Sequence, residues 1–183
     1  MEANRTKMDH IVIGARDLAQ GVDFVNRVLG VDMPFGGVHQ LDKAPVLLTW
    51  VVNTDNIIGM LEALPFSFGM PEKVTRGNLT WCFGLPEDGR LLAGGMLPYV
   101  MEWQTEVHPA ANMADLGCRL QQVEIYHPHP AWLEEKLDLI GAASLVRLQA
   151  LPEQSRPYLM VHMDTPDGPR TLKSCGYREK TPA

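Results

Sequence analysis

One pattern occurs three times in this chain: an apolar strand, a polar residue that can cap a helix, and an amphipathic helix. The first copy lies in residues 9–30, DHIVIGARDLAQGVDFVNRVLG, with Asp17 at the cap position. The second copy has Asp55 at that position, and the third has His129 there, directly before Pro130. Short polar residues before a helix and proline in its first turn are typical of helix starts. We therefore expect three strand–helix units in a common register.

This register also predicts which strand side chains face the helices, because successive side chains point to opposite faces of a sheet. Counting back from each cap places Ile11, Thr49 and Val123 in the phase that packs under a helix. The opposite phase, which we expect to line a cleft, holds His10, Val12, Leu48, Trp50, Gln122, Glu124 and Tyr126.

Further strands are expected after the second and third helices. We expect a loop over 66–73 and strands within 76–84 and 91–103, and then strands at 145–150, 158–164 and 170–174. The first unit has room for one short strand at 33–39 before the second unit begins. Either the protein lacks the remaining strands of that unit, or the sequence lacks a segment after Gln40.

The predicted fold is α+β, with repeated βαβββ units that form curved mixed sheets, helices on the outer faces and a shortened first unit. The expected divisions are an incomplete first unit at 1–46, a second unit at 47–105, a linker at 106–117, a third unit at 118–176 and a flexible tail at 177–183.

Composition limits the kind of partner. With 183 residues and 45% hydrophobic content, the chain can bury a core without disulfides. A formal net charge of -6 and the lack of a basic run argue against nucleic acid or an anionic membrane, which leaves a small molecule as the expected partner. Cys82, Cys118 and Cys175 lie far apart, and the polar N-terminus resembles neither a signal peptide nor a membrane span, so we expect a cytoplasmic location.

Three segments resemble a known family: MDHIVIGARDLAQGVDFVNRVLGV, TRGNLTWCFGLPEDGRLLAGGMLPYVMEW and GCRLQQVEIYHP. They are similar to the glyoxalase-like domain of the vicinal oxygen chelate superfamily, which includes glyoxalase I, extradiol dioxygenases, bleomycin-resistance proteins and methylmalonyl-CoA epimerase. The resemblance covers nearly the whole chain, and it rests on the order of the elements more than on a tight catalytic motif.

The resemblance implies a divalent metal on the concave sheet face, with positions left open for substrate oxygens. His10 corresponds to a ligand in a first strand, and Glu102 to a ligand in a last strand. A third ligand would come from the missing strands, from His39 or from a partner subunit. Two simpler roles also remain open: His10 bonded to the backbone, and Glu102 paired with Arg76.

Glu102 has a second predicted role that needs no metal. A carboxylate that is partly desolvated beside Trp103 would have a raised pKa and would suit proton abstraction next to a carbonyl. Trp50, Trp81 and Trp103 would form the walls of the cleft, and Arg76 would hold an anionic group of the substrate. Core packing for the tryptophans and a solvated strand edge for the arginine are the alternatives.

Two other groups of residues have structural explanations. Glu124 is expected to pair with Lys173 in the third unit. The sequence His127-Pro128-His129-Pro130 suits a turn and a helix start better than a metal site. No GxSxG, P-loop, GxGxxG or HExxH pattern is present, which gives no support to serine-hydrolase, nucleotide-phosphate or zincin functions.

The leading hypothesis is a glyoxalase-like enzyme that acts on an oxygen-rich small molecule, with His10 and Glu102 as catalytic residues or metal ligands. Isomerase, lyase and dioxygenase reactions all stay open, because this fold hosts several chemistries. The alternative is a non-catalytic protein that sequesters a ligand, as bleomycin-resistance proteins do. We also expect a homodimer, since a shortened first unit would leave a sheet edge to be covered.

Overall fold

The computed structural model describes residues 6–32 and 44–174. Its elements, in chain order, are β1 (Lys7–Gly14), α1 (Leu18–Leu29), β2 (Val46–Asn53), α2 (Ile57–Ala63), β3 (Met70–Arg76), β4 (Leu79–Leu85), β5 (Tyr99–Trp103), β6 (Arg119–His127), α3 (Pro130–Leu139), β7 (Arg147–Ala150), β8 (Tyr158–Thr165) and β9 (Gly168–Lys173). Three short 3-10 helices, η1 (Leu92–Gly95), η2 (Pro109–Asn112) and η3 (Ala143–Leu145), complete this part of the chain.

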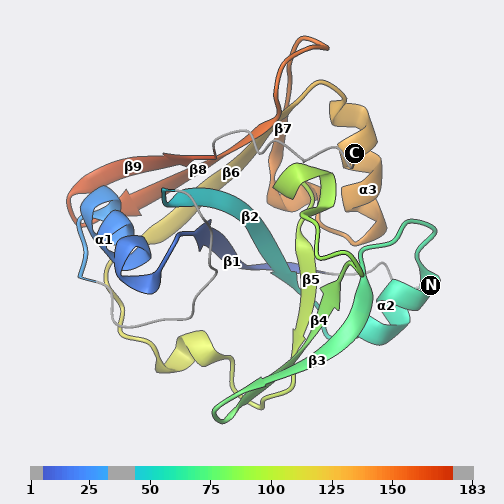
Figure 1. Ribbon diagram of the computed structural model, residues 1–183, viewed down its shortest axis with the longest axis horizontal. Coiled ribbons are helices and arrows are strands. Elements are labelled where there is room, and N and C mark those ends of the chain that lie inside the picture. Colours follow the sequence, from blue (N-terminus) through green and yellow to red (C-terminus); the bar gives the residue numbers. More distant parts are fainter. Residues whose placement is uncertain (1–5, 33–43, 175–183) are drawn as a thin grey trace.

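The strands form two mixed sheets (Figure 1). One has the order β1-β2-β5-β4-β3 and the other the order β7-β6-β8-β9. In the first sheet β2 and β5 run parallel, and in the second β6 and β7 run parallel, while the other pairs are antiparallel. This arrangement confirms the predicted α+β fold with βαβββ units. The two complete units share an order of elements and differ in pairing, because β2 lies beside its last strand whereas β6 lies between β7 and β8.

Helix capping follows the sequence signal at α1 and differs at the other two helices: α2 is capped one residue later than predicted, and His129 before α3 makes no side-chain capping hydrogen bond. Asp17 accepts a hydrogen bond from the Gln20 N–H at 2.9 Å and starts α1, and Gly30 ends that helix in the left-handed conformation with φ 68°. At α2 the capping side chain is that of Asn56, which accepts from the Gly59 N–H, and not that of Asp55. The second unit is therefore shifted by one residue from the predicted register.

This shift turns the side chains of β2 to the opposite faces, since strand side chains alternate. Val123 and Ile11 pack with the helices as predicted, but in β2 it is Trp50 and Val52 that join the helix-side core. Val51 lies on the other face, with Val12.

The segment 66–76 also differs from its prediction. Residues 70–76 form β3 where a loop was expected over 66–73, and the expected strand at 76–84 contains the turn of the β3–β4 hairpin. Pro71 is tolerated because β3 is an edge strand, whose outward side needs no N–H donor. The interval 91–103 is strand only from Tyr99 onward.

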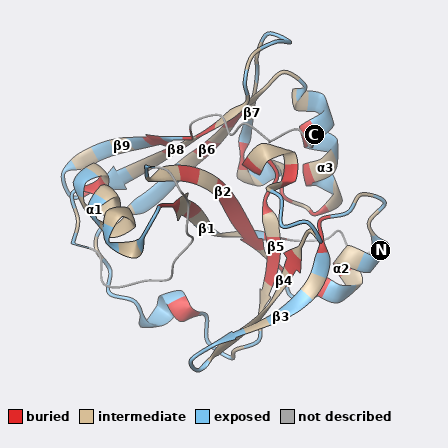
Figure 2. Cartoon of the chain, viewed as in Figure 1, coloured by how far each residue is buried: buried red, intermediate tan, exposed pale blue. Residues whose placement is uncertain are grey.

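The larger of two apolar clusters joins both sheets with α1, α2 and α3 (Figure 2). It includes Leu29 of α1, Ile57 and Met60 of α2, and Leu133 and Leu137 of α3, and β2 and β5 contribute fully buried residues. α1 contacts β9 and α3 contacts β7 of the four-stranded sheet, while α2 contacts β3, β4 and β5 of the five-stranded sheet (Figure 1). The other face of the five-stranded sheet carries a separate, smaller cluster around Val12, Val51 and Met101.

Several predictions lie outside the described residues: the strand at 33–39, a ligand role for His39, and the tail at 177–183. Within the described ranges, no helix is both long enough and apolar enough to span a membrane.

Candidate acid–base site

A β-bulge near the start of β1 places two neighbouring polar side chains together. The pairing of β1 with β2 is irregular between Met8 and His10, so Asp9 is not in regular alternation. A bulge of this kind redirects a side chain. Nδ1 of His10 lies 2.6 Å from Oδ1 of Asp9 as a result.

The carboxylate of Asp9 is the centre of a four-residue group, which we call the Asp9 cluster: Asp9, His10, Trp103 and His108. Oδ2 of Asp9 accepts from Nε1 of Trp103 and contacts Nε2 of His108, both at 2.9 Å. The side chain of Asp9 is only 3% exposed, whereas those of His10 and His108 are 45% and 42% exposed. A buried carboxylate thus supports two imidazoles that solvent can reach.

Opposing effects set the pKa of Asp9. Burial raises this pKa. The hydrogen bonds from His10, His108 and Trp103, together with the charge of His10, lower it by more than burial raises it, and the pKa falls to about 2. Asp9 is therefore ionised at neutral pH and acts only as a hydrogen-bond acceptor.

The hydrogen bonds give the two histidines different roles. Nε2 of His108 faces Asp9, and its Nδ1 accepts from the Ala110 N–H at 3.2 Å, which assigns the tautomer with the proton on Nε2. Both nitrogens of His108 are thus engaged. His10 donates through Nδ1 to Asp9, and no group among the described residues bonds to its Nε2. The free lone pair of Nε2 makes His10 the proton acceptor of the cluster.

Aromatic rings extend the same sheet face. Trp103 packs on Trp81 with ring centroids 5.5 Å apart, and Phe83 packs on Tyr99 at 5.3 Å. All four surround the buried residues Val12, Val51 and Met101. Trp81 and Trp103 therefore lie on the sheet face that carries the Asp9 cluster. A flat or apolar part of a ligand would find aromatic contacts there, and their role as walls of a ligand site stays a prediction.

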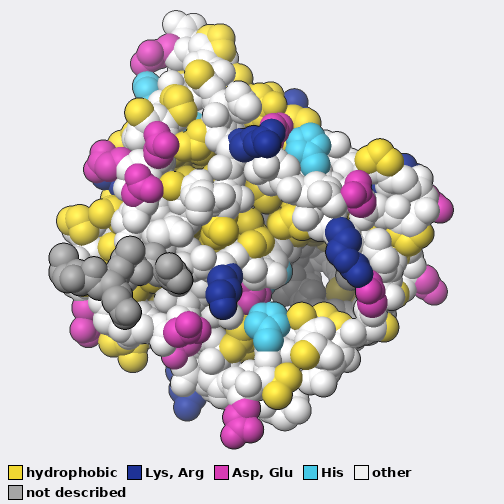
Figure 3. Space-filling model, turned by 180° about the vertical axis from the view of Figure 1, so that it is seen from behind, with side chains coloured by type: hydrophobic (Ala, Val, Ile, Leu, Met, Phe, Trp, Pro, Cys, Tyr) yellow, Lys and Arg dark blue, Asp and Glu magenta, His cyan; other side chains and the backbone are white. Residues whose placement is uncertain are grey.

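The back of the molecule is hollowed near its centre (Figure 3). Histidine side chains and basic side chains stand around this hollow, and hydrophobic surface lies close to it (Figure 3).

Glu102 is not part of this site, which corrects the prediction that it shares a site with His10. Along β5, Trp103 points to the Asp9 side, so the preceding side chain points to the opposite face. Oε2 of Glu102 accepts from the Ile57 N–H at 2.8 Å, at the start of α2, and Oε1 accepts from Gln104. Its contacts are those of a helix-capping residue.

Trp50 does not line the cleft either. Its side chain is fully buried in the helix-side core, and its Nε1 donates to the carbonyl of Met96 at 3.0 Å. The one-residue shift at Asn56 explains why the predicted phase was wrong for this residue. Arg76 is exposed at the end of β3. Its side chain lies on the same face of the sheet as Val74, which pairs with Trp81 of β4. Anion binding by Arg76 stays a prediction.

The described residues do not by themselves form a divalent-metal site, and the predicted metal stays a prediction. His10 and Glu102 lie on opposite faces, and the described ranges contain no group of three or more His, Cys, Asp or Glu side chains arranged for a metal ion. In the Asp9 cluster, Nδ1 of His10 and Nε2 of His108 both contact the carboxylate, so these two nitrogens do not converge on a shared metal position.

The second sheet has a polar network on its helix-free face. Oε2 of Glu124 contacts Nε2 of His162 and accepts from the hydroxyl of Tyr126, both at 3.1 Å, and these hydrogen bonds lower the pKa of Glu124 against the effect of its desolvation. Nζ of Lys173 lies 3.9 Å from the ring centroid of Tyr158. The expected Glu124–Lys173 pair is therefore replaced by a Glu–His pair.

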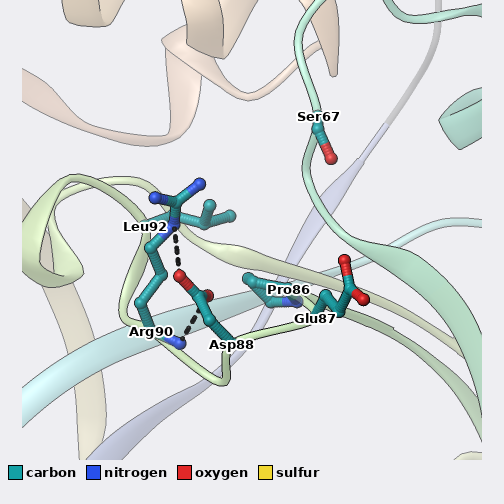
Figure 4. Close-up of a pocket in the computed structure, with 6 residues that line it drawn as sticks. All are labelled: Ser67, Pro86, Glu87, Asp88, Arg90 and Leu92. Atoms are coloured by element: carbon teal, nitrogen blue, oxygen red, sulfur yellow. Dashed lines mark hydrogen bonds and ion pairs between the residues drawn. The ribbon is translucent and has the colours of Figure 1, made fainter.

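A surface pocket of about 390 Å³ lies elsewhere, lined by Ser67, Pro86, Glu87, Asp88, Arg90 and Leu92 (Figure 4). Arg90 and Asp88 are bonded to each other on its wall, through the Arg90 N–H at 3.2 Å and the guanidinium at 3.5 Å. None of its lining residues belongs to the Asp9 cluster, and two of its charged residues, Asp88 and Arg90, pair with each other. The chemistry points to the cluster and not to this pocket.

A model of the family described as a glyoxalase-like domain matches residues 39–140, which is more than half of the chain. The chain belongs to the glyoxalase-like domain family. In this glyoxalase-like chain the match includes Trp81, Trp103 and His108, while Asp9 and His10 lie before it. Searches of curated proteins and of solved structures found no match.

Sequence reasoning missed Asp9 and His108. The adjacent pair Asp9-His10 was a signal, but regular alternation would send the two side chains to opposite faces, and a bulge is hard to foresee from sequence. His108 lies in the segment interpreted as a linker. Its role depends on a contact with a residue 99 positions earlier in the chain.

Proposed function

We propose that this glyoxalase-like protein is an enzyme that transfers a proton next to a carbonyl group of a small, oxygen-rich molecule, as an isomerase or a lyase. The observation that carries the proposal is the pair formed by His10 and Asp9. An imidazole with one free nitrogen, held through its other nitrogen by a buried carboxylate, is an arrangement suited to general acid–base catalysis.

In the proposed reaction, Nε2 of His10 takes a proton from the carbon beside the carbonyl. The ring then carries a positive charge, which the ionised carboxylate of Asp9 stabilises at 2.6 Å. His10 next returns the proton to a neighbouring carbon or to a departing group. Asp9 and His108 act as positioning residues, because His108 and Trp103 hold the carboxylate in place.

Isotope exchange tests the proposal before the physiological substrate is known. The protein is incubated in D2O with a panel of 2-oxo acids, hydroxy ketones and thioester carbonyl compounds, and deuterium entry beside the carbonyl is followed by proton NMR. A general base contributes about 100-fold to 10,000-fold in rate, so His10→Gln should slow the exchange by at least about 100-fold. His129→Gln is the matched control, since the side chain of His129 is 58% exposed and lies outside the cluster.

Exchange at equal rates in wild type and His10→Gln would contradict the proposal. Absence of exchange with the whole panel would favour the second candidate, a non-catalytic protein that sequesters a ligand. The aromatic pairs Trp81–Trp103 and Phe83–Tyr99 favour this candidate, because they offer stacking contacts for a flat molecule. A thermal-shift screen with aromatic and cationic ligands would identify it by stabilisation without turnover.

A cytoplasmic location, a homodimer and a divalent metal belong to the proposal as predictions from the sequence. No step described above uses a metal, and a third ligand at His39 falls outside the described residues. Metal analysis of the purified protein, compared with His10→Gln, would show whether a metal depends on this histidine.

A further inference from the structure

The strand β3 forms one end of the five-stranded sheet, with an unpaired side. Among the described strands it pairs only with β4. Most of its side chains are exposed, including that of Met70 at 63%. A strand edge presents free N–H and C=O groups that can pair with another strand.

The turn of the hairpin shows which backbone groups are free. Arg76 pairs with Leu79 across a two-residue turn in which Gly77 has φ 61°, the positive value that such turns need. Residues that flank a two-residue turn exchange both backbone hydrogen bonds, and hydrogen-bonded pairs then alternate along the hairpin. The backbone groups of Arg76 and of every second residue before it therefore point to β4.

The backbone groups that point away from β4 are consequently those of Thr75, Lys73 and Pro71. The position of Pro71 is consistent with this alternation. Proline has no N–H to donate, and it is found in edge strands where the backbone group points away from the sheet. The free edge of β3 thus offers two complete sets of donor and acceptor, at Lys73 and Thr75.

We propose that a second copy of this chain pairs with that edge, antiparallel and about a two-fold axis at Val74. In this register Lys73 of one copy forms hydrogen-bonded pairs with Thr75 of the other, in both directions. Glu72 then lies opposite Arg76 of the second copy, also twice. The two five-stranded sheets become one continuous sheet.

Charge selects this register. Arg76 and Glu72 are exposed and form no ion pair with any described residue, so both are available to the second copy. Shifting the strands by two residues would place Lys73 opposite Lys73 of the second copy, and like charges directly opposite destabilise a sheet. Charged residues and proline often protect an edge from pairing. Here Glu72 and Arg76 of one chain face Arg76 and Glu72 of a second copy, so these charges favour pairing with that copy over pairing with other strands.

Cysteine cross-linking tests the register. In the proposed dimer the two Val74 side chains meet at the axis in a non-hydrogen-bonded pair, where Cβ atoms are about 5 Å apart. Val74→Cys should therefore form a disulfide-linked dimer under mild oxidation, and wild type should not. Thr75→Cys is the matched control: its two copies are diagonal neighbours, about 7 Å apart, so it should cross-link far less.

Charge reversal tests the ion pairs by analytical ultracentrifugation. Glu72→Arg and Arg76→Glu should each raise the dimer Kd at least about tenfold, since each change acts twice, and the double variant should return to near wild type. A wild-type protein that is monomeric at all concentrations would overturn the proposal. So would a dimer that neither single variant weakens, or one in which Val74→Cys and Thr75→Cys cross-link equally.

Discussion

Replacing Asp9 by asparagine should remove a pH-dependent part of the stability. The folded protein holds the pKa of Asp9 at about 2, below the ordinary value of 3.8 for an aspartate side chain. At 1.36 kcal/mol per pKa unit, this difference corresponds to about 2 kcal/mol of folding stability. Because the folded pKa is the lower one, this contribution is complete above about pH 5 and is lost as the pH falls through 4 toward 2.

Urea unfolding at a series of pH values between 6 and 2 measures this contribution. The wild-type free energy of unfolding should fall by about 2 kcal/mol more over this range than that of Asp9→Asn. Because the comparison uses the change in unfolding free energy with pH, any pH-independent destabilisation caused by the Asp9→Asn substitution drops out. Glu134→Gln is the control, because the Glu134 side chain is exposed on α3 and forms no ion pair with a described residue, so its loss should leave the slope close to wild type. Equal slopes in wild type and Asp9→Asn would refute the reasoning.

Three further changes probe the contacts around the site. Trp103→Phe removes the indole donor to Asp9, so the pKa of Asp9 should rise in an NMR titration and the free energy of unfolding should fall by about 1 kcal/mol. Glu102→Ala leaves the Ile57 N–H at the start of α2 without its acceptor and should cost about 1 kcal/mol in urea unfolding, while deuterium exchange with a carbonyl substrate stays at wild-type rate. Asp9→Asn should slow that exchange by about 1,000-fold or more, because the amide favours the proton on Nε2 of His10 and blocks the base.

The sequence predicted the fold well where the signals are local. The cap at Asp17, the end of α1 at Gly30 and the start of α3 at Pro130 depend on backbone hydrogen bonding within a few residues. Such chemistry can be recognised in a linear sequence.

The site was harder to predict, because single-residue shifts decide which face of a sheet a side chain occupies. Capping by Asn56 in place of Asp55 moved Trp50 into the core. The bulge at Asp9 brought a second polar side chain to His10. Neither shift changes the hydrophobic pattern enough to be seen in advance.

The tautomer of His10 tests the central claim most directly. Long-range nitrogen–proton NMR of protein labelled with 15N-histidine distinguishes the two nitrogens of each neutral ring without any substrate. We predict that neutral His10 carries its proton on Nδ1 and has a free Nε2, while His108 carries its proton on Nε2. A His10 ring that is protonated on Nε2 would contradict the account, because no free base would then remain in the Asp9 cluster.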